Sequence, residues 1–416
     1  MPAPSALDAP YEFLGADTVA EHLRARPGLA ERIDPCALDL VQEVGDGNLN
    51  LVFLLRDTAG RRMVLKQALP YVRLVGPSWP MSPDRARHEA EAMRLHGSLA
   101  PELVPVLYDF DESRHVLAME DLSDHRVWRA ALNDGLRHDG AAEAMGRYVG
   151  RVAFGTSVLG MPAEQQKQTL AAAVNPGLCR ITEDLVFTEP LVDAGRNSVL
   201  AANEPDAVTL ATDPVFAGEL GRAKWTFMTR AEALIHGDLH TGSVMVRAVE
   251  GEQGEVSSVK AFDSEFAFYG PVAFDLGALW ANYVIAAARA TALGDDERAA
   301  WALQLCGRTW TSFETTVRQA WPSRVDPRVF GDDLLEHLLQ TWRSEAWLFG
   351  AAKMARRIVG LAKTTDIESL DPALREGAAR GVLQVAQRWV RERHTGSDPR
   401  RAEQVAGELL AATTTR

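Results

Sequence analysis

Residues 234–246 read LIHGDLHTGSVMV, and residues 259–280 read VKAFDSEFAFYGPVAFDLGALW. Each segment combines an apolar, strand-like run with acidic residues at its end. Asp238 lies in a His-Gly-Asp loop before the first run, and Asp263 and Glu265 follow the second. Phosphoryl-transfer sites are often built this way, because one carboxylate orients or deprotonates the attacking hydroxyl while others hold magnesium ions. The two segments therefore predict phosphoryl transfer, with Asp238 as the catalytic carboxylate.

The spacing of these motifs supports that interpretation. A kinase catalytic loop has the form H-R-D-x-x-x-x-N, in which the last residue binds metal. Ser243 stands at that distance from Asp238, and Asp263 stands where the metal-binding Asp of a D-F-G motif would be. The alternative is a loop capped by Asp beside an ordinary acidic turn. Both motifs resemble small-molecule kinases of the aminoglycoside and choline type, and their order at two strand ends favours the kinase.

Composition excludes several other classes of protein. The chain has 416 residues, a net charge of −13, 46% hydrophobic and 24% charged residues, as in a globular protein. The negative charge argues against nucleic acid as the main partner. No apolar run of about 18 residues predicts a membrane span, and the N-terminus does not resemble a signal peptide. Three widely separated cysteines form no CxxC pair and suit a reducing cytoplasm.

The first third of the chain predicts a nucleotide-binding sheet, preceded by a helix at 18–26 with Asp17 as its cap. Strands are expected at Leu38–Val44, Asn50–Arg56 and Arg62–Leu69. The turn between the first two contains Gly45, Gly47 and Asn48, and its backbone N–H groups could approach phosphate oxygens, although a plain hairpin is the commoner meaning. Lys66 is the only lysine among the first 166 residues, and it follows Met-Val-Leu as the ATP-contacting lysine of kinases follows Val-Ala-Ile.

A helix from Ser82-Pro83 to about His96 is predicted next, with Ser at the N-cap and Pro at N1. Glu89 lies mid-helix, where a kinase has the glutamate that pairs with its strand lysine, and Glu91 is the alternative. Two strands, Val104–Phe110 and His115–Met119, complete the sheet. Glu120 and Leu122 then leave it at the position where the backbone of kinases binds adenine.

From Asp124 onward the chain is predicted to be mostly helical. Residues 174–210 show no clear pattern. Adjacent arginines, Arg356 and Arg357, lie near the end of the last expected helix and could clamp a phosphate or sugar hydroxyls, although a surface pair is the simpler interpretation. The expected helices are 127–132, 140–159, 165–173, 216–233, 282–292, 297–320 and 332–363.

Across about residues 11–385, the chain closely resembles the 5-methylthioribose kinases of methionine salvage. The resemblance implies an α+β, two-lobed protein-kinase-like fold, with a small antiparallel sheet in residues 1–122 and a larger, mainly helical lobe in residues 123–416. The matching segments are GDGNLN (45–50), KQALPY (66–71), GPSWP (76–80), DRARHE (84–89), MEDLS (119–123), HGDLHTGS (236–243), DSEFAFYGP (263–271) and RRIVG (356–360).

The resemblance also implies a reaction and a set of roles. ATP would transfer its γ-phosphate to the anomeric hydroxyl of methylthioribose, with Mg²⁺ as the metal and a homodimer as the assembly. Asp238 would be the catalytic carboxylate, and Lys66 would contact phosphate. The remaining roles fall to groups: metal binding to Asp263, Glu265 and Ser243, adenine binding to Glu120 and Leu122, and substrate binding to Asp238, Arg356 and Arg357.

Other interpretations stay open at this point. The acceptor could be another 5-modified pentose such as 5-deoxyribose, or an aminoglycoside- or nucleoside-like metabolite. A paired arginine beside the substrate would argue against a cationic acceptor. A catalytically inactive, kinase-like binding module is the alternative from another class. It predicts loss of Lys66, Asp238 or Asp263, and all three are present.

Overall fold

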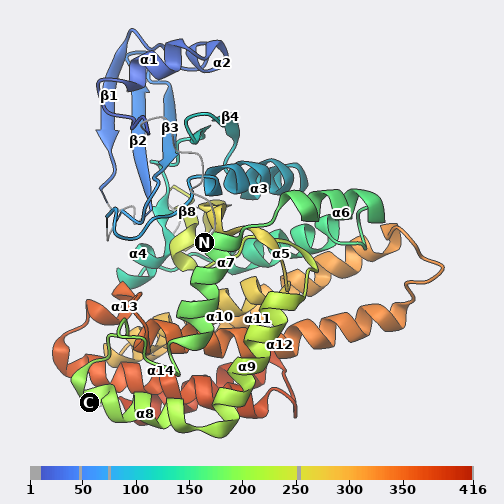
Figure 1. Cartoon of the computed structure of the whole chain (residues 1–416). Helices are drawn as coiled ribbons and strands as arrows, with labels where there is room; N and C mark the ends of the chain where they lie inside the picture. The colour runs from blue at the N-terminus through green and yellow to red at the C-terminus, as the bar shows by residue number, and fades with distance from the viewer. Residues whose placement is uncertain (1–10, 46–48, 74–75, 251–253, 415–416) are drawn as a thin grey trace, which may run out of the picture. The chain divides into compact units, whose positions relative to one another are not determined.

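The computed structural model describes residues 11–45, 49–73, 76–250 and 254–414. The chain divides into two compact units, Met1–Ser123 and Asp124–Arg416, and each is described by itself (Figure 1). The first unit is built on a small antiparallel sheet, and the second is mostly helical. The predicted α+β class is therefore confirmed.

The sheet of the first unit has five antiparallel strands in the order β1-β2-β3-β5-β4. Its central strand, β3, is buried at every position except Arg62. The fourth strand begins at Leu107 rather than at the predicted Val104, because Pro105 has no N–H to donate to the ladder. The strands are β1 (Leu38–Glu43), β2 (Asn50–Asp57), β3 (Arg62–Ala68), β4 (Leu107–Asp111) and β5 (Val116–Met119).

Alternation along the strands gives this sheet two covered faces. Met63 and Leu65 of β3 pack with Leu23 and Leu29 from the short helices α1 (Val19–Arg24) and α2 (Pro27–Ala30). The alternate residue Val64 packs against α3 (Arg85–Leu99) on the other face. Lys66 follows in the same alternation as Val64, so the pleat alone directs its side chain toward α3.

Two helices of this unit begin one and three residues later than predicted, at Val19 and Arg85. The first helix begins after Thr18, whose hydroxyl accepts the Gly15 N–H, and Asp17 does not cap it. The helix predicted from Ser82 begins at Arg85 instead. Ser82 Oγ accepts the N–H of Asp84 at 3.2 Å and so completes the turn that precedes the helix.

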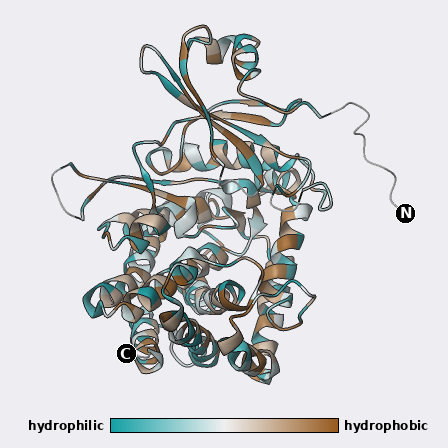
Figure 2. Ribbon diagram, turned by 90° about the vertical axis from the view of Figure 1, so that its left-hand side faces the viewer, coloured by the Kyte–Doolittle hydropathy of each residue, from teal (hydrophilic) through white to brown (hydrophobic). Residues whose placement is uncertain are grey.

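The second unit is organised around the buried helix α10 (Ala273–Ala292), which is covered along its whole length except at Arg289 and Thr291. Helices α11 (Asp296–Ala320), α12 (Asp332–Val359) and α14 (Pro372–Glu392) pack against it, and Figure 2 shows the hydrophobic segments of this unit. Because α10 is apolar all round, its first turns carry no 3.6-residue pattern. The sequence prediction therefore began this helix too late, at Asn282.

Glycines allow α10 and α12 to cross closely. A Cβ added to Gly277 would lie 2.7 Å from the Gly350 backbone nitrogen and 2.8 Å from the Ala346 carbonyl oxygen. A Cβ on Gly350 would meet the Trp389 ring of α14 at 2.9 Å. This crossing lies one helical turn before Lys353 and two turns before Arg357, so it fixes how closely the end of α12 approaches the first turn of α10.

Short strands carry the two acidic motifs. The two predicted strand-like runs are confirmed as β8 (Val244–Ala248) and β9 (Val256–Ala261), which pair antiparallel, with β6 (Arg126–Val127) beside β8. A second pair, β7 (Ala233–Ile235) with β10 (Phe268–Gly270), was not predicted. The helix expected to reach Ala233 ends at Thr229, because this backbone pairs with β10 instead.

The remaining helices between residues 124 and 233 lie near their predicted positions or in residues 174–210, which showed no clear pattern. Three helices near the C-terminus, α13, α14 and α15, were not predicted, because the last expected helix ended at residue 363. Residues 174–210 contain α7, a π-helical segment at Glu183–Thr188, and α8. Helix α12 ends at Val359, before Gly360, rather than at Lys363. No helix in the described ranges is both long and apolar enough to cross a membrane. These helices are α4 (Trp128–Asn133), α5 (Ala141–Thr156), α6 (Ala163–Ala172), α7 (Pro176–Thr182), α8 (Glu204–Thr212), α9 (Pro214–Thr229), α13 (Thr365–Glu368) and α15 (Pro399–Thr413).

The helix crossing gives a first prediction. Gly277→Ala should lower the free energy of unfolding by about 1–3 kcal/mol, because the new methyl group meets backbone atoms that cannot move aside. Gly218→Ala is the matched control, since Gly218 is exposed in α9 with open space around it, and should raise stability by about 0.5–1 kcal/mol. Urea unfolding measures both, and equal effects of the two substitutions would contradict the close-crossing explanation.

Candidate active site

In the first unit, the structure brings Lys66 and Glu89 together. Lys66 Nζ lies 2.7 Å from Glu89 Oε1, and both side chains are buried. The alternative partner, Glu91, pairs with Arg87 on the same helix at 3.1 Å. The strand lysine thus faces the helix glutamate that the kinase-like spacing indicated.

Other predicted nucleotide contacts in this unit are backbone positions. A Cβ added to Gly45 would meet no atom of the described residues within 4 Å, so none of them demands glycine there. Gly47 and Asn48 lie outside the described residues. The Glu120 N–H donates to the Val106 carbonyl at 2.9 Å, whereas the Leu122 N–H donates to no acceptor within the described ranges. Leu122 thus offers a donor at the end of the segment that follows β5.

In the second unit, Asp275 of α10 holds the His-Gly-Asp loop. Its Oδ2 accepts the His236 N–H at 2.8 Å and its Oδ1 accepts the Gly237 N–H at 3.1 Å. Gly237 has a φ of +81°, and a Cβ there would lie 2.2 Å from the Phe266 carbonyl oxygen. Only glycine fits this position. Because Phe266 directly follows the Asp-Ser-Glu motif, this contact packs the two acidic loops against each other.

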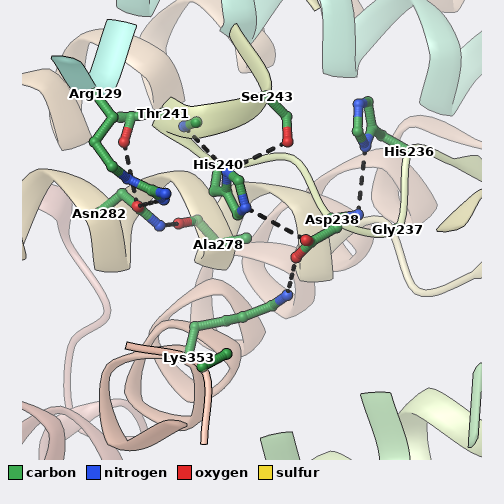
Figure 3. Close-up of polar contacts among 12 residues, drawn as sticks. Arg129, His236, Gly237, Asp238, His240, Thr241, Ser243, Ala278, Asn282 and Lys353 are labelled. Atoms are coloured by element: carbon green, nitrogen blue, oxygen red, sulfur yellow. Dashed lines mark hydrogen bonds and ion pairs between the residues drawn. The ribbon is translucent and has the colours of Figure 1, made fainter. Parts of the chain in front are cut away.

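Asp238 lies at the centre of a set of positive and donor groups (Figure 3). Its Oδ1 lies 2.7 Å from Lys353 Nζ and 3.9 Å from Arg356 Nη1, and its Oδ2 lies 3.3 Å from His240 Nε2. Burial alone would raise the pKa of Asp238, but Lys353, His240 and Arg356 outweigh burial and hold that pKa well below its usual range. Asp238 is therefore an anion at neutral pH.

His240 is a neutral donor to this carboxylate. The Gly242 N–H donates to His240 Nδ1 at 3.0 Å, so the ring proton belongs on Nε2, which faces Asp238. Burial, opposed by Asp238 and reinforced by Arg129, lowers the pKa of His240 to about 3. Ser243 Oγ also lies 3.3 Å from Nδ1, so its hydroxyl faces His240 in this structure.

A second polar layer supports this loop from α4 and α10. Arg129 Nη2 donates to Asn282 Oδ1 at 2.8 Å, and the Thr241 hydroxyl lies 3.2 Å from the same oxygen (Figure 3). Arg129 Nε lies 3.4 Å from the buried carboxylate of Asp366. A Cβ at Gly242 would meet the Arg129 guanidinium at 2.7 Å. The Thr-Gly-Ser segment thus needs its glycine to let this arginine approach.

Arg356 and Arg357 are both buried, with 9% and 8% exposure, so they are not a surface pair. Burial lowers the pKa of each guanidinium. Arg356 points a nitrogen toward Asp238, and Arg357 Nη1 lies 3.3 Å from the Ala362 carbonyl oxygen, to which it donates. The segment after Gly360 supplies acceptors for one of them, because Arg357 Nη1 also donates to the Lys363 carbonyl at 3.4 Å.

The Asp-Ser-Glu motif offers an oxygen-rich pair. One carboxylate oxygen of Asp263 and one of Glu265 lie within 4.8 Å of each other, and Glu265 is buried. Asp263 adopts a left-handed conformation with φ 66°, which starts the tight turn Ser264–Phe266. Asn175 Nδ2 donates to the Glu265 carbonyl at 2.8 Å and fixes that turn. Carboxylate oxygens are the ligands that Mg²⁺ prefers, so the pair fits this ion.

Sequence reasoning missed three residues that shape the site: Lys353, Asp275 and Arg129. Two of them carried a signal. Lys353 is one of only six lysines among 44 basic residues, and Asp275 is a single acidic residue inside the apolar run PVAFDLGALW. Arg129 carried none, because arginine is common in this chain. Residues so far apart in sequence can be assigned to one site only after the helices are packed.

The anchoring role of Asp275 can be tested with Asp275→Asn. Asparagine has one acceptor oxygen for two backbone donors, so one buried N–H loses its partner and stability should fall by about 1–3 kcal/mol. The turnover number should fall as well, because Asp238 lies on the loop that those N–H groups anchor. Asp371→Asn is the control, because Asp371 caps α14 in solvent and Asn caps equally well. A turnover number unchanged in Asp275→Asn would contradict the anchoring role.

Comparison with known proteins identifies the family of the chain. Residues 40–314 match the phosphotransferase enzyme family. Methylthioribose kinase of Yersinia pseudotuberculosis serotype O:1b is 37% identical over 372 residues, covering 87% of each chain. The corresponding protein of Pectobacterium atrosepticum is 38% identical over 371 residues, covering 86% of this chain and 89% of that protein.

Among solved structures, a choline kinase from Cryptosporidium parvum Iowa II is similar at a TM-score of 0.45 and 10% identity. The match covers 96% of this chain and 98% of that one. The sequence comparisons are much closer than this structural one, and they decide the classification. The chain belongs to the phosphotransferase enzyme family and, within it, to the methylthioribose kinases.

Proposed function

We propose that this protein transfers the γ-phosphate of ATP to the anomeric hydroxyl of methylthioribose. The observation that carries the proposal is Asp238, an ionised carboxylate held among Lys353, His240 and Arg356 in a chain of the methylthioribose kinase family. An anion with donors on two sides is suited to orienting an acceptor hydroxyl for attack on phosphorus.

In this reaction, Asp238 accepts the hydrogen bond of the acceptor hydroxyl and takes its proton as the oxygen–phosphorus bond forms. Its low pKa makes it a weak base, so it acts mainly by orientation until the transition state, when the hydroxyl becomes acidic. His240 and Arg356 keep the carboxylate in one rotamer. Arg356 and Arg357 then contact the sugar and the transferred phosphate.

ATP is bound through the residues of the first unit. Lys66, oriented by Glu89, contacts the phosphates, and the backbone of Glu120 and Leu122 contacts adenine. The turn that contains Gly45, Gly47 and Asn48 covers the phosphates. The nucleotide-binding role of residues 1–122 and the substrate-binding role of residues 123–416 are part of the same proposal.

Asp263 and Glu265 would hold Mg²⁺, because one carboxylate oxygen of each lies within 4.8 Å of the other. Ser243 would be the further ligand from the His-Gly-Asp loop. When bound, the ion neutralises charge on the ATP phosphates. We also propose a homodimer in the cytoplasm, as the family resemblance implies.

The buried cations favour a neutral sugar over the alternative acceptors. Lys353, Arg356 and Arg357 lie close together on α12, and a polycationic aminoglycoside would be repelled by them. They do not distinguish methylthioribose from 5-deoxyribose, because these differ at the far end of the sugar.

Substrate choice can be tested directly. Purified protein with magnesium and ATP should consume ATP fastest with methylthioribose, more slowly with 5-deoxyribose or ribose, and not at all with kanamycin. A coupled ADP-release assay gives kcat/KM for each acceptor. Preference for another sugar would reject methylthioribose as the substrate but keep the phosphotransferase, whereas preference for kanamycin would reject a neutral acceptor.

The role of Asp238 can be tested with Asp238→Asn. The turnover number should fall by about 10²–10⁴-fold, because the amide neither takes a proton nor orients the hydroxyl as an anion does. ATP affinity, measured by calorimetry, should stay within about twofold, because Asp238 is assigned to the acceptor and not to the nucleotide. Turnover at the wild-type rate would remove Asp238 from the mechanism and would favour a different catalytic group.

A further inference from the structure

Lys353 is a buried ammonium that the reaction as described so far does not use. Its side chain is 4% exposed, and it lies on α12 one turn after the glycine crossing with α10. The Phe274 ring lies 4.5 Å from Nζ on one side, and Asp238 Oδ1 lies 2.7 Å from it on another. The side chain therefore has little freedom, and its charge is directed at the catalytic carboxylate (Figure 3).

Most of the hydrogen-bonding capacity of this ammonium is unused. A lysine ammonium has three N–H donors, and Asp238 Oδ1 is the only acceptor for Lys353 Nζ among the described residues. The guanidinium of its neighbour Arg356 makes no hydrogen bond to any described residue, and its buried Nε has no partner. Buried cationic donors without acceptors are costly, which indicates that a ligand supplies the acceptors.

The charge balance around Asp238 identifies that ligand as an anion. Asp275 is occupied by two backbone N–H groups of the loop, and Asp366 lies near Arg129. The cations of this cluster outnumber its carboxylates even when Asp275 and Asp366 are counted as charged. The cations are Lys353, Arg356, Arg357 and Arg129, and the carboxylates are Asp238, Asp275 and Asp366.

We propose that Lys353 is a catalytic residue whose ammonium bridges Asp238 and the phosphoryl group in transfer. One N–H holds the carboxylate, and the others donate to phosphoryl oxygens. The inference rests on the proposed phosphoryl transfer at Asp238, but not on the identity of the sugar. As the acceptor oxygen bonds to the γ-phosphorus, the bond from that phosphorus to the bridging oxygen of ADP breaks. The hydroxyl proton passes to Asp238, and Lys353 keeps its own protons throughout.

Kinetics of two variants test this role. Lys353→Met should lower kcat by about 10²–10³-fold while the KM for ATP changes by less than about threefold, because the lost contact forms with the group in transfer. Lys353→Arg should recover at least about a tenth of the wild-type kcat, since it restores a cation. Lys224→Met is the matched control, because Lys224 of α9 donates to Thr188 and to no other residue that the structure describes, and it should leave kcat within about twofold.

The pH dependence separates a catalytic role from a structural one. Burial, opposed by Asp238 and reinforced by Arg356 and Arg357, lowers the pKa of Lys353 to about 8. Asp275, whose own pKa is raised by burial, also faces Lys353. If the charged form is required, kcat/KM for ATP should fall as pH rises through about 8 in the wild type. Lys353→Arg should keep its rate above that pH. An identical alkaline profile in the two proteins would overturn the proposal.

Binding of inorganic phosphate tests the anion contact without any sugar. Wild-type protein should bind phosphate in calorimetry, and Lys353→Met should weaken that binding at least about tenfold. No binding by the wild type at about 10 mM phosphate, or equal binding by the variant, would overturn the proposal. Failure of methylthioribose turnover with these phosphate results intact would reject the sugar and leave Lys353 in its role.

The melting temperature of each variant shows whether it is folded. If Lys353→Met does not fold, the comparison between wild type and Lys353→Arg still tests the role of Lys353. The two quantities compared are then the pH profile of kcat/KM and the affinity for phosphate. Loss of kcat in Lys353→Met with unchanged phosphate binding and no recovery in Lys353→Arg would reduce Lys353 to a residue that only positions Asp238.

Discussion

The ion pair between Asp238 and Lys353 is the constraint on which the geometry of the candidate site depends. Taking a carboxylate and an ammonium out of water is costly, and their attraction compensates only when both are held in one geometry. Here the carboxylate lies on a loop and the ammonium lies on a helix 115 residues later in the sequence. Lys353 Nζ and Asp238 Oδ1 are nevertheless 2.7 Å apart. Each element that positions either group therefore contributes to the site.

The loop side of that pair is fixed by groups with little freedom. Asp275 accepts hydrogen bonds from two consecutive backbone N–H groups. Gly237 adopts a left-handed backbone conformation, and its lack of a Cβ leaves room for the Phe266 carbonyl. The helix side is fixed by the glycine crossing between α10 and α12, which brings Lys353 within reach of the loop. Asp275 and Gly277 are both in the first turns of α10, so one buried helix serves both sides of the pair.

The two units show different ways to place a charged pair. Lys66 and Glu89 follow local rules, because strand alternation sends Lys66 toward α3, and helix spacing turns Glu89 back toward the strand. Such a pair needs only one strand and one helix in contact. Asp238 and Lys353 need α10, α12 and two loops, and their pairing depends on packing that no short segment encodes.

By itself, the sequence determined the five strands of the first unit and the two strand-like runs beside the acidic motifs, and its family resemblance indicated the α+β class. It also singled out Asp238, Lys66, Asp263 and Glu265 as the candidate site residues. Local patterns and fixed spacing carry that information. The tertiary structure alone decided that Arg356 and Arg357 are buried, that Glu89 rather than Glu91 meets Lys66, and that Lys353 and Asp275 contact the His-Gly-Asp loop. The physical reason is that a long buried helix has no polar face to give a periodic signal, and a contact between residues more than a hundred positions apart arises only when such helices pack.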